Sequence, residues 1–159
     1  MNNGVVQLGV PDVQGLIDLE KLCFAYHWTQ EQFILVLEKS VFRTLGIMNG
    51  EQLAGYITFS LIEDEMEILN IAVHPDFRRK GIAARLLDRA FEICIKKGIA
   101  KSFLDVKKSN TAALNLYQKY GYKQIGVRKN YYPDTKEDAL LFRYDFEQGY
   151  DCNLLKVAK

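Results

Sequence analysis

The stretch from Ile71 to Ala84 contains residue types that can bind a large anion. An apolar strand pattern passes through His74-Pro75 into three consecutive cations, a glycine and the start of a helical pattern. The cations and the glycine are Arg78, Arg79, Lys80 and Gly81. A helix N-terminus exposes unpaired N–H groups at the positive end of the helix dipole, and a glycine lets a bulky anion approach that backbone closely. The pattern predicts a pyrophosphate-binding turn; the alternative is an ordinary solvated basic cap on an amphipathic helix.

This turn differs from two common phosphate-binding loops. The pattern Gly-x-x-x-x-Gly-Lys-Ser/Thr is absent, and no Gly-x-Gly-x-x-Gly follows an N-terminal strand. The turn is therefore neither a Walker loop nor a Rossmann turn. The binding groups expected here are the cationic side chains and the first backbone amides of the helix, at Ile82, Ala83 and Ala84.

The composition argues against several classes of protein. The 159 residues carry 21 Lys and Arg against 20 Asp and Glu, which argues against nucleic acid as a partner. The longest apolar run, Phe33 to Leu37, is too short to span a membrane, and no secretory signal is present, so we expect a cytoplasmic protein with no membrane partner. Three separated cysteines and two histidines without ligand spacing predict neither a disulfide framework nor a metal site.

The elements that must position the turn alternate between helices and strands. Helical patterns run from Asp12 to Cys23, from Thr29 toward Phe42, and over Ile82–Lys97 and Thr111–Tyr120. Strand patterns begin at Thr44 and continue over 53–62, 66–73, 102–106, 122–131 and 139–146, with Asn49-Gly50 predicting a hairpin turn. This order predicts one α/β domain with a mixed sheet, and residues 147–159 form a tail to which the sequence assigns no role.

The motif Arg78-x-x-Gly81-x-Ala83 resembles the Arg/Gln-x-x-Gly-x-Gly/Ala signature of the GNAT superfamily of acetyltransferases, which hold the pyrophosphate of acetyl-CoA on such a turn. Residues 70–75 look like the family's fourth strand, and 104–122 like its fifth strand and following helix. The resemblance covers roughly residues 5–146. It implies a mixed, mostly antiparallel twisted sheet of six to seven strands flanked by about four helices.

A second pair of motifs is narrower. Asn130-Tyr131-Tyr132-Pro133 with Glu137-Asp138-Ala139 resembles the RimI-type ribosomal-protein N-terminal acetyltransferases. This resemblance implies transfer of acetyl from acetyl-CoA to the α-amino group of a protein N-terminus, with a ribosomal protein as an acceptor. Acetylation of lysine, a polyamine or another small amine, and CoA binding without catalysis, are the alternatives.

The acceptor amine must be neutral when it attacks the thioester. With reference pKa values of ~7.7–8.0 for an α-amine and ~10.4 for lysine, removing the proton at pH 7 costs about 1 kcal/mol and roughly 4.6 kcal/mol respectively. A modest base therefore suffices for an α-amine. This difference makes a weak carboxylate site more compatible with an N-terminus than with lysine.

The resemblance assigns three candidate catalytic residues. Asp105 is the candidate base, although RimI-type enzymes carry glutamate there, so proton removal through a water is an option. The alternative for Asp105 is a carboxylate at a strand end that is simply solvated or pairs with Lys107 or Lys108. Glu67 is the alternative base, or else an outward-facing strand residue. Tyr117 matches the family's general acid toward the CoA sulfur, and the alternative is a core tyrosine on an amphipathic helix.

The resemblance also assigns cofactor contacts outside the turn. Asn110 would hydrogen-bond the CoA chain, cap the helix that starts at Thr111, or do both. Ile71, Ala72 and Val73 would offer backbone groups to the pantetheine arm, or serve only as core. Acetyl-CoA is the expected acetyl donor, and no metal is expected.

Aromatic residues are the expected acceptor contacts. Tyr131 and Tyr132 resemble residues that line the peptide pocket, although a simple strand pair is the alternative. Tyr26 and Trp28 lie where the family has an aromatic-Pro-Trp segment in a substrate loop, and His27 replaces the proline. The expected partners are acetyl-CoA and a protein or peptide N-terminus, bound by a monomer or a weak dimer.

Overall fold

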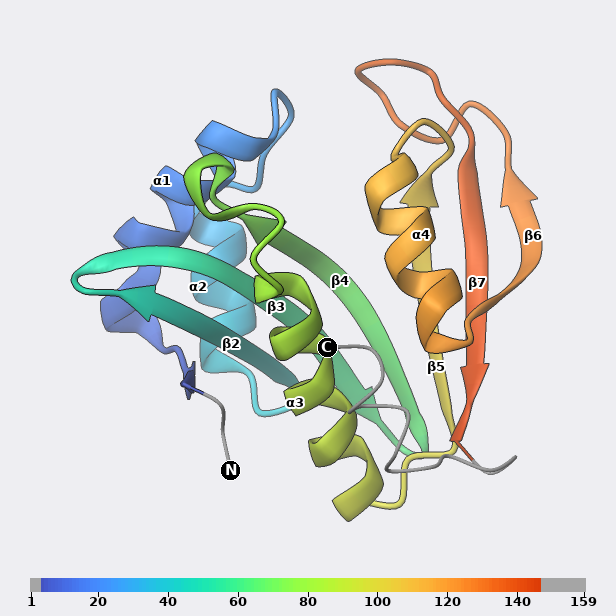
Figure 1. Ribbon diagram of the computed structural model, residues 1–159, viewed down its shortest axis with the longest axis horizontal. Coiled ribbons are helices and arrows are strands. Elements are labelled where there is room, and N and C mark those ends of the chain that lie inside the picture. Colours follow the sequence, from blue (N-terminus) through green and yellow to red (C-terminus); the bar gives the residue numbers. More distant parts are fainter. Residues whose placement is uncertain (1–3, 147–159) are drawn as a thin grey trace.

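A seven-stranded sheet runs through the centre of the computed structural model, which describes residues 4–146 (Figure 1). The strand order is β1-β2-β3-β4-β5-β7-β6, and among these neighbours β4 and β5 are parallel while the other pairs are antiparallel. The strands are β1 (Val5–Gln7), β2 (Phe42–Asn49), β3 (Gln52–Ile62), β4 (Glu65–Val73), β5 (Lys101–Lys107), β6 (Lys123–Arg128) and β7 (Ala139–Asp145). The expectation of a mixed, mostly antiparallel sheet is confirmed.

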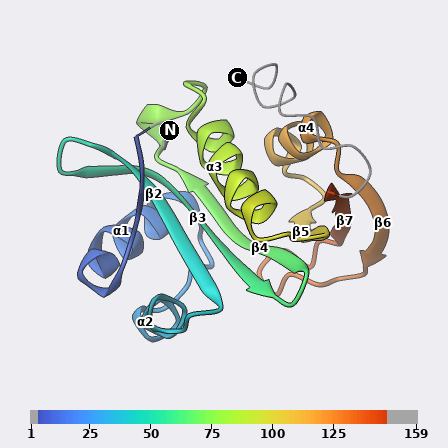
Figure 2. The same ribbon diagram turned by 90° about the horizontal axis from the view of Figure 1, so that it is seen from below.

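Helices cover both faces of this sheet (Figure 2). One face carries α1 (Val13–Cys23) and α2 (Gln30–Glu38), and the other carries α3 (Ile82–Lys96) and α4 (Thr111–Tyr120). Each face has its own apolar cluster, and the larger one lies under α3 and α4. None of the helices between residues 4 and 146 combines the length and the apolar character needed to cross a membrane.

Local capping explains where several helices begin and end. The Thr29 side chain accepts a hydrogen bond from Gln32 N at 3.2 Å, and Gln32 Oε1 accepts one from Thr29 N at 2.8 Å, which together form a capping box. Asn110 Oδ1 accepts from Ala113 N at 3.2 Å and so caps α4. Gly121, at φ +98°, ends α4 in the left-handed conformation that favours glycine.

Two elements were predicted to extend too far along the chain, and one short strand was missed. The second helix ends at Glu38, and β2 already begins at Phe42, because Lys39 takes an extended conformation. The strand expected over 122–131 ends at Arg128, because the chain turns at Asn130 with φ +50°. The strand Val5–Gln7 was missed, since three residues are too few to show an alternating pattern. The tail 147–159 lies outside the described residues.

The pairing of β4 is the feature that positions the site. Thr58 pairs with Asn70 and Phe59 with Ile68, so Leu69 is a bulged residue without an opposite partner on β3. Because side chains alternate along a strand, this extra residue places Glu67 and Asn70 on the same face of the sheet. On its other side, β4 pairs with β5 only from Glu65–Lys101 to Ile68–Leu104, and beyond that point the strands separate (Figure 1).

An aromatic cluster beneath α3 holds the β5–β7 part of the sheet in place. Phe91, only 1% exposed, lies with its ring centroid 5.0–6.1 Å from four other rings. Those rings belong to Tyr120, Tyr122, Tyr144 and Phe146. Tilted and edge-on contacts at this spacing stabilise a core beyond simple burial.

The substitution Phe91→Ala should lower the free energy of unfolding by about 3–5 kcal/mol, because it removes a buried ring and leaves a cavity. Urea denaturation followed by circular dichroism measures this loss. Ile95→Ala, on the same helix but at a side chain that is 40% exposed, should cost less than about 1 kcal/mol. Equal losses for the two variants would contradict the stabilising role assigned to the aromatic cluster.

Candidate active site

A cleft of about 1110 Å³ opens where β4 and β5 separate. It is lined by residues from α1, the α1–α2 loop, β4, β5, α4 and the β6–β7 loop. The predicted site residues among them are Tyr26, Trp28, Glu67, Ile71, Asp105, Asn110, Tyr117, Tyr131 and Tyr132. Segments that are far apart in the sequence therefore meet in one cleft, and all three candidate catalytic residues are among them.

Two carboxylates face this cleft from neighbouring strands. Glu67 lies on β4 opposite Phe103 of β5, and Asp105 lies two residues further along β5 on the same face. Partial desolvation and the neighbouring Asp105 carboxylate raise the pKa of Glu67. The Glu67 carboxyl therefore holds its proton more readily than a free glutamate does.

Two tyrosines stand near these carboxylates. Tyr117 on α4 is 3% exposed, and burial, followed by the neighbouring Tyr132, raises its pKa well above the usual value. Burial and the Asp105 charge raise the pKa of Tyr132 to about 12. Both phenols are therefore protonated at neutral pH. Tyr117 has the protonation state that a general acid needs.

The segment Glu137-Asp138 explains how the β6–β7 loop is held over the cleft. The carboxylate of Glu137 accepts from Ser109 N at 3.2 Å and from the Thr135 hydroxyl at 3.0 Å, and its backbone carbonyl accepts from Tyr131 N at 3.0 Å. Asp138 accepts from the backbone N of residue 130 at 3.0 Å. The two acidic residues thus tie the tyrosine pair to the loop that leads into α4.

Lys107 adds a second connection to the same loop. Its Nζ donates to Asp134 at 2.9 Å and lies 5.1 Å from the centre of the Tyr132 ring. The sequence-based alternative in which Asp105 pairs with Lys107 has no support, because the recorded ion pair of Lys107 is with Asp134. Tyr131, in contrast, is 46% exposed and stands edge-on to Tyr132 at 5.3 Å.

The basic turn lies at the N-terminus of α3, directly after β4. Gly81 has φ +76°, and a Cβ there would meet no atom within 4 Å, so the backbone conformation rather than space requires glycine. Arg79 also has a positive φ of 61°. The helix's first hydrogen bond runs from Arg85 N to Gly81 O at 3.0 Å, so the amides of residues 82–84 have no acceptor within the helix. This geometry fits a phosphate group.

Arg78 differs from the other two cations of the turn. Its Nε donates to the Val73 carbonyl at 3.1 Å, and its Nη2 lies 3.7 Å from Cys23 Sγ. The Cys23 thiol also donates to the Val73 carbonyl, at 3.4 Å. Arg78 therefore joins the end of β4 to the end of α1, although it is exposed like Arg79 and Lys80.

The three residues of β4 expected to meet the pantetheine arm do not all direct their backbone groups to the same side of the strand. His74 N donates to Ala54 O on β3 at 2.8 Å, so the alternation along the strand also directs the backbone groups of Ala72 toward β3. Those of Ile71 and Val73 are directed to the side from which β5 has separated. The expectation for Ala72 is therefore not supported. Ile71 is placed to meet a ligand through both of its backbone groups, whereas Val73 offers its N–H, because the Val73 carbonyl already accepts from Arg78 Nε and the Cys23 thiol.

The α1–α2 loop, residues 24–29, forms the wall opposite the tyrosine pair. Tyr26 is 69% exposed, and the Trp28 ring lies 5.2 Å from that of Phe33 on α2. Glu20 lies beneath this loop, 1% exposed, and also lines the cleft; the sequence reasoning missed it. The signal was present, because Glu20 follows Leu16 by four residues and so falls on the apolar side of α1.

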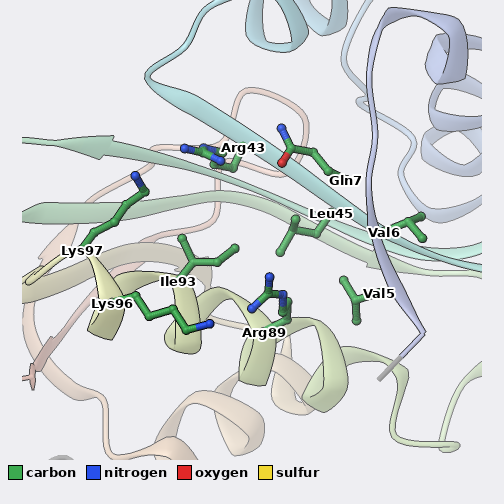
Figure 3. Close-up of a pocket in the computed structure, with 9 residues that line it drawn as sticks. All are labelled: Val5, Val6, Gln7, Arg43, Leu45, Arg89, Ile93, Lys96 and Lys97. Atoms are coloured by element: carbon green, nitrogen blue, oxygen red, sulfur yellow. The ribbon is translucent and has the colours of Figure 1, made fainter. Parts of the chain in front are cut away.

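A second groove, of about 700 Å³, lies between β1, β2 and α3, and none of the predicted site residues lines it. Its cations are Arg43, Arg89, Lys96 and Lys97, which surround apolar side chains of the strands and helix (Figure 3). Arg89 pairs with Glu92 at 3.2 Å. The two lysines stand at the C-terminal end of α3, where the helix dipole favours positive charge. Ordinary helix electrostatics accounts for these lysines.

Comparisons with known proteins agree with this geometry. Residues 13–122 match the Acetyltransferase (GNAT) family. The putative [ribosomal protein bS18]-alanine N-acetyltransferase of Bacillus subtilis is 34% identical over 138 residues, which cover 86% of this chain and 91% of the relative. The corresponding enzyme of Escherichia coli K12 is 32% identical over 87% of this chain and 95% of its own length.

Solved structures show the same fold. The crystal structure of the ribosomal-protein-S18-alanine N-acetyltransferase from Escherichia coli has a TM-score of 0.84 at 27% identity, covering 92% of this chain and 98% of that one. Arabidopsis thaliana NAA60 in complex with acetyl-CoA has a TM-score of 0.81 at 17% identity, covering 90% and 98%, a likeness of fold alone. The family resemblance of the turn and of the tyrosine motif is confirmed: the chain belongs to the GNAT family of acetyltransferases.

Proposed function

We propose that this N-acetyltransferase transfers the acetyl group of acetyl-CoA to the α-amino group of a protein N-terminus, with a ribosomal protein as its physiological acceptor. The observation that carries the proposal is the convergence of Asp105, Tyr117 and Tyr132 in the cleft between the separated strands. The Bacillus subtilis and Escherichia coli relatives, whose names specify an alanine of ribosomal protein bS18, support the acceptor class.

The residues present fit acetyl-CoA, which supplies the acetyl group as a thioester. The left-handed Gly81 and the first amides of α3 suit the pyrophosphate, and Arg79 and Lys80 add positive charge there. The backbone groups of Ile71 and the N–H of Val73 suit the amides of the pantetheine arm. Because Asn110 Oδ1 already caps α4, a contact from Asn110 to the CoA chain falls to its Nδ2.

Two side chains of the cleft would move protons. Asp105 accepts a proton from the acceptor α-ammonium, directly or through a water, so that the neutral amine attacks the thioester carbonyl. The buried Tyr117 hydroxyl donates its proton to the departing sulfur, and the second proton, which the acylated nitrogen loses as the amide forms, returns to the Tyr117 oxygen. The aromatic walls formed by the α1–α2 loop and the tyrosine pair would hold the first residues of the acceptor.

Peptides of one sequence, with varied first residues and one internal lysine, should be acetylated on the α-amine alone when incubated with the enzyme and acetyl-CoA. The physical reason is the lower cost of deprotonating an α-amine, about 1 kcal/mol against roughly 4.6 kcal/mol for lysine at pH 7. Mass spectrometry with fragmentation locates each acetyl group. Acetyl on lysine in a peptide with a blocked N-terminus would support the alternative acceptor, and no transfer to any amine would support a CoA-binding module.

Tyr117→Phe should lower kcat by about 100-fold or more while leaving the KM of both substrates within a few-fold, because it removes a proton donor but little volume. Steady-state release of free CoA measures this change. Tyr144→Phe is the matched control, since Tyr144 is a largely buried phenol that does not line the cleft. Full turnover by Tyr117→Phe at neutral pH would contradict the proton-donor role.

Asp105→Asn should lower kcat by about 100-fold or more, whereas Glu67→Gln should lower it less than tenfold. The dependence of kcat/KM on pH separates the two candidates. Asp105 raises the pKa of Glu67, so removing that charge lowers the pKa of Glu67. If Glu67 were the base, Asp105→Asn would retain activity and move the acidic limb of the profile to lower pH, which would refute the assignment of Asp105.

A further inference from the structure

Glu20 is one of two acidic side chains that are buried within residues 4–146, and the proposed proton transfers do not use it. Its Oε1 accepts hydrogen bonds from the Tyr56 hydroxyl on β3 and from Asn70 Nδ2 on β4. Asn70 Nδ2 also donates to the Tyr56 oxygen at 2.7 Å, so these three side chains form one cluster. Burial raises the pKa of Glu20, and its hydrogen bonds oppose that rise.

The other carboxylate oxygen of Glu20 faces the α1–α2 loop. Trp28 N donates to Oε2 at 3.4 Å, eight residues further along the chain. One carboxylate thus joins the backbone of the loop to two strands of the sheet. Tyr56 strengthens the connection, because its ring packs edge-on at 6.0 Å against Phe33, which in turn contacts the Trp28 ring.

This cluster faces the cleft rather than the interior alone. Glu20, Trp28 and Asn70 all line it, and Asn70 stands beside the bulge at Leu69 where β4 leaves β5. A buried carboxylate costs free energy of desolvation, and a well-packed apolar side chain would stabilise α1 at least as well. The presence of Glu20 is therefore better explained by the conformation that its carboxylate imposes on the α1–α2 loop than by the stability of α1.

We infer that Glu20 is a positioning residue that fixes the α1–α2 loop at Trp28, so that this loop forms a rigid wall of the acceptor site. The inference rests on the proposed function, in which the α1–α2 loop binds the acceptor peptide. Glu20 does not touch the phosphate turn, so its effect is on the acceptor peptide and not on acetyl-CoA. Rigid binding loops lower the conformational cost of binding a flexible peptide.

Glu20→Gln keeps the shape of the side chain but removes its charge. It also replaces one accepting oxygen with an amide N–H₂, which cannot accept the hydrogen bonds that the carboxylate receives. The peptide KM should rise about tenfold, with kcat changed less than threefold and acetyl-CoA affinity unchanged. Trp28 is the one tryptophan of the chain, so its fluorescence reports on the loop directly. Its emission should shift to longer wavelength in Glu20→Gln as the ring loses its fixed contact with Phe33.

Glu38→Gln, at the exposed end of α2, is the matched control and should change neither the kinetics nor the emission. An unchanged peptide KM and emission in Glu20→Gln would overturn the inference. A fall in kcat at constant peptide KM would also overturn it, because that result would indicate a direct part in the chemistry.

Hydrogen exchange in the wild-type enzyme supplies a test that does not depend on the folding of a variant. The Trp28 amide should exchange more slowly than that of His27, after correction for intrinsic rates, because Glu20 accepts its hydrogen bond. Equal exchange would overturn the inference. If the wild type transfers acetyl to no peptide, the proposed function fails, whereas the exchange and fluorescence results still decide the role of Glu20.

Discussion

The short parallel contact between β4 and β5 is the constraint on which the site depends. β4 follows β3 along its length, and β5 follows β7 from Lys101 to Lys107, so the two halves of the sheet share only four residue pairs. Past Ile68 and Leu104 the facing edges have no partner strand, and buried backbone groups left this way need another source of hydrogen bonds. A ligand with amide groups along an extended arm meets that need. The separation of the strands thus supplies both the space and the backbone groups that the pantetheine arm of the proposed cofactor would need.

The two ends of this gap carry opposite charge. The end at α3 has exposed cations and the positive pole of the helix, which favour phosphate. The cleft on the other side contains the carboxylates of Glu67, Asp105 and Glu20, which favour an ammonium group. A cofactor that is anionic at one end and an acceptor that arrives protonated are thereby drawn to different ends. In the proposed reaction their reactive groups would meet where the strands separate, near Asp105 and Tyr117.

Short sequence patterns correctly predicted helix ends and turns that short-range interactions determine. The helix Thr111–Tyr120 was predicted to the residue, because Asn110 and Gly121 cap it by short-range hydrogen bonds and backbone preference. The turn at Gly81 and the start of α3 at Ile82 were predicted for the same reason. The bulge at Leu69, the insertion of β7 between β5 and β6 and the burial of Glu20 depend on contacts between segments far apart in the chain, which no short pattern encodes. The cofactor side of the site was therefore more predictable than the acceptor side.

Asp105 stands where RimI-type enzymes carry glutamate, and this change bears on the acceptor. The missing methylene withdraws the carboxylate by about 1.5 Å, the length of one C–C bond. The structure surrounds the shorter side chain with Glu67 and Tyr132, both of which respond to its charge. A base set back in this way, acting through a water, suits an amine whose proton costs only about 1 kcal/mol to remove at pH 7. It suits lysine poorly, since roughly 4.6 kcal/mol must then be supplied before the amine attacks. With Asp105 as the proposed base, the aspartate would therefore favour N-termini as acceptors, through the proton affinity of the amine rather than through the shape of the cleft.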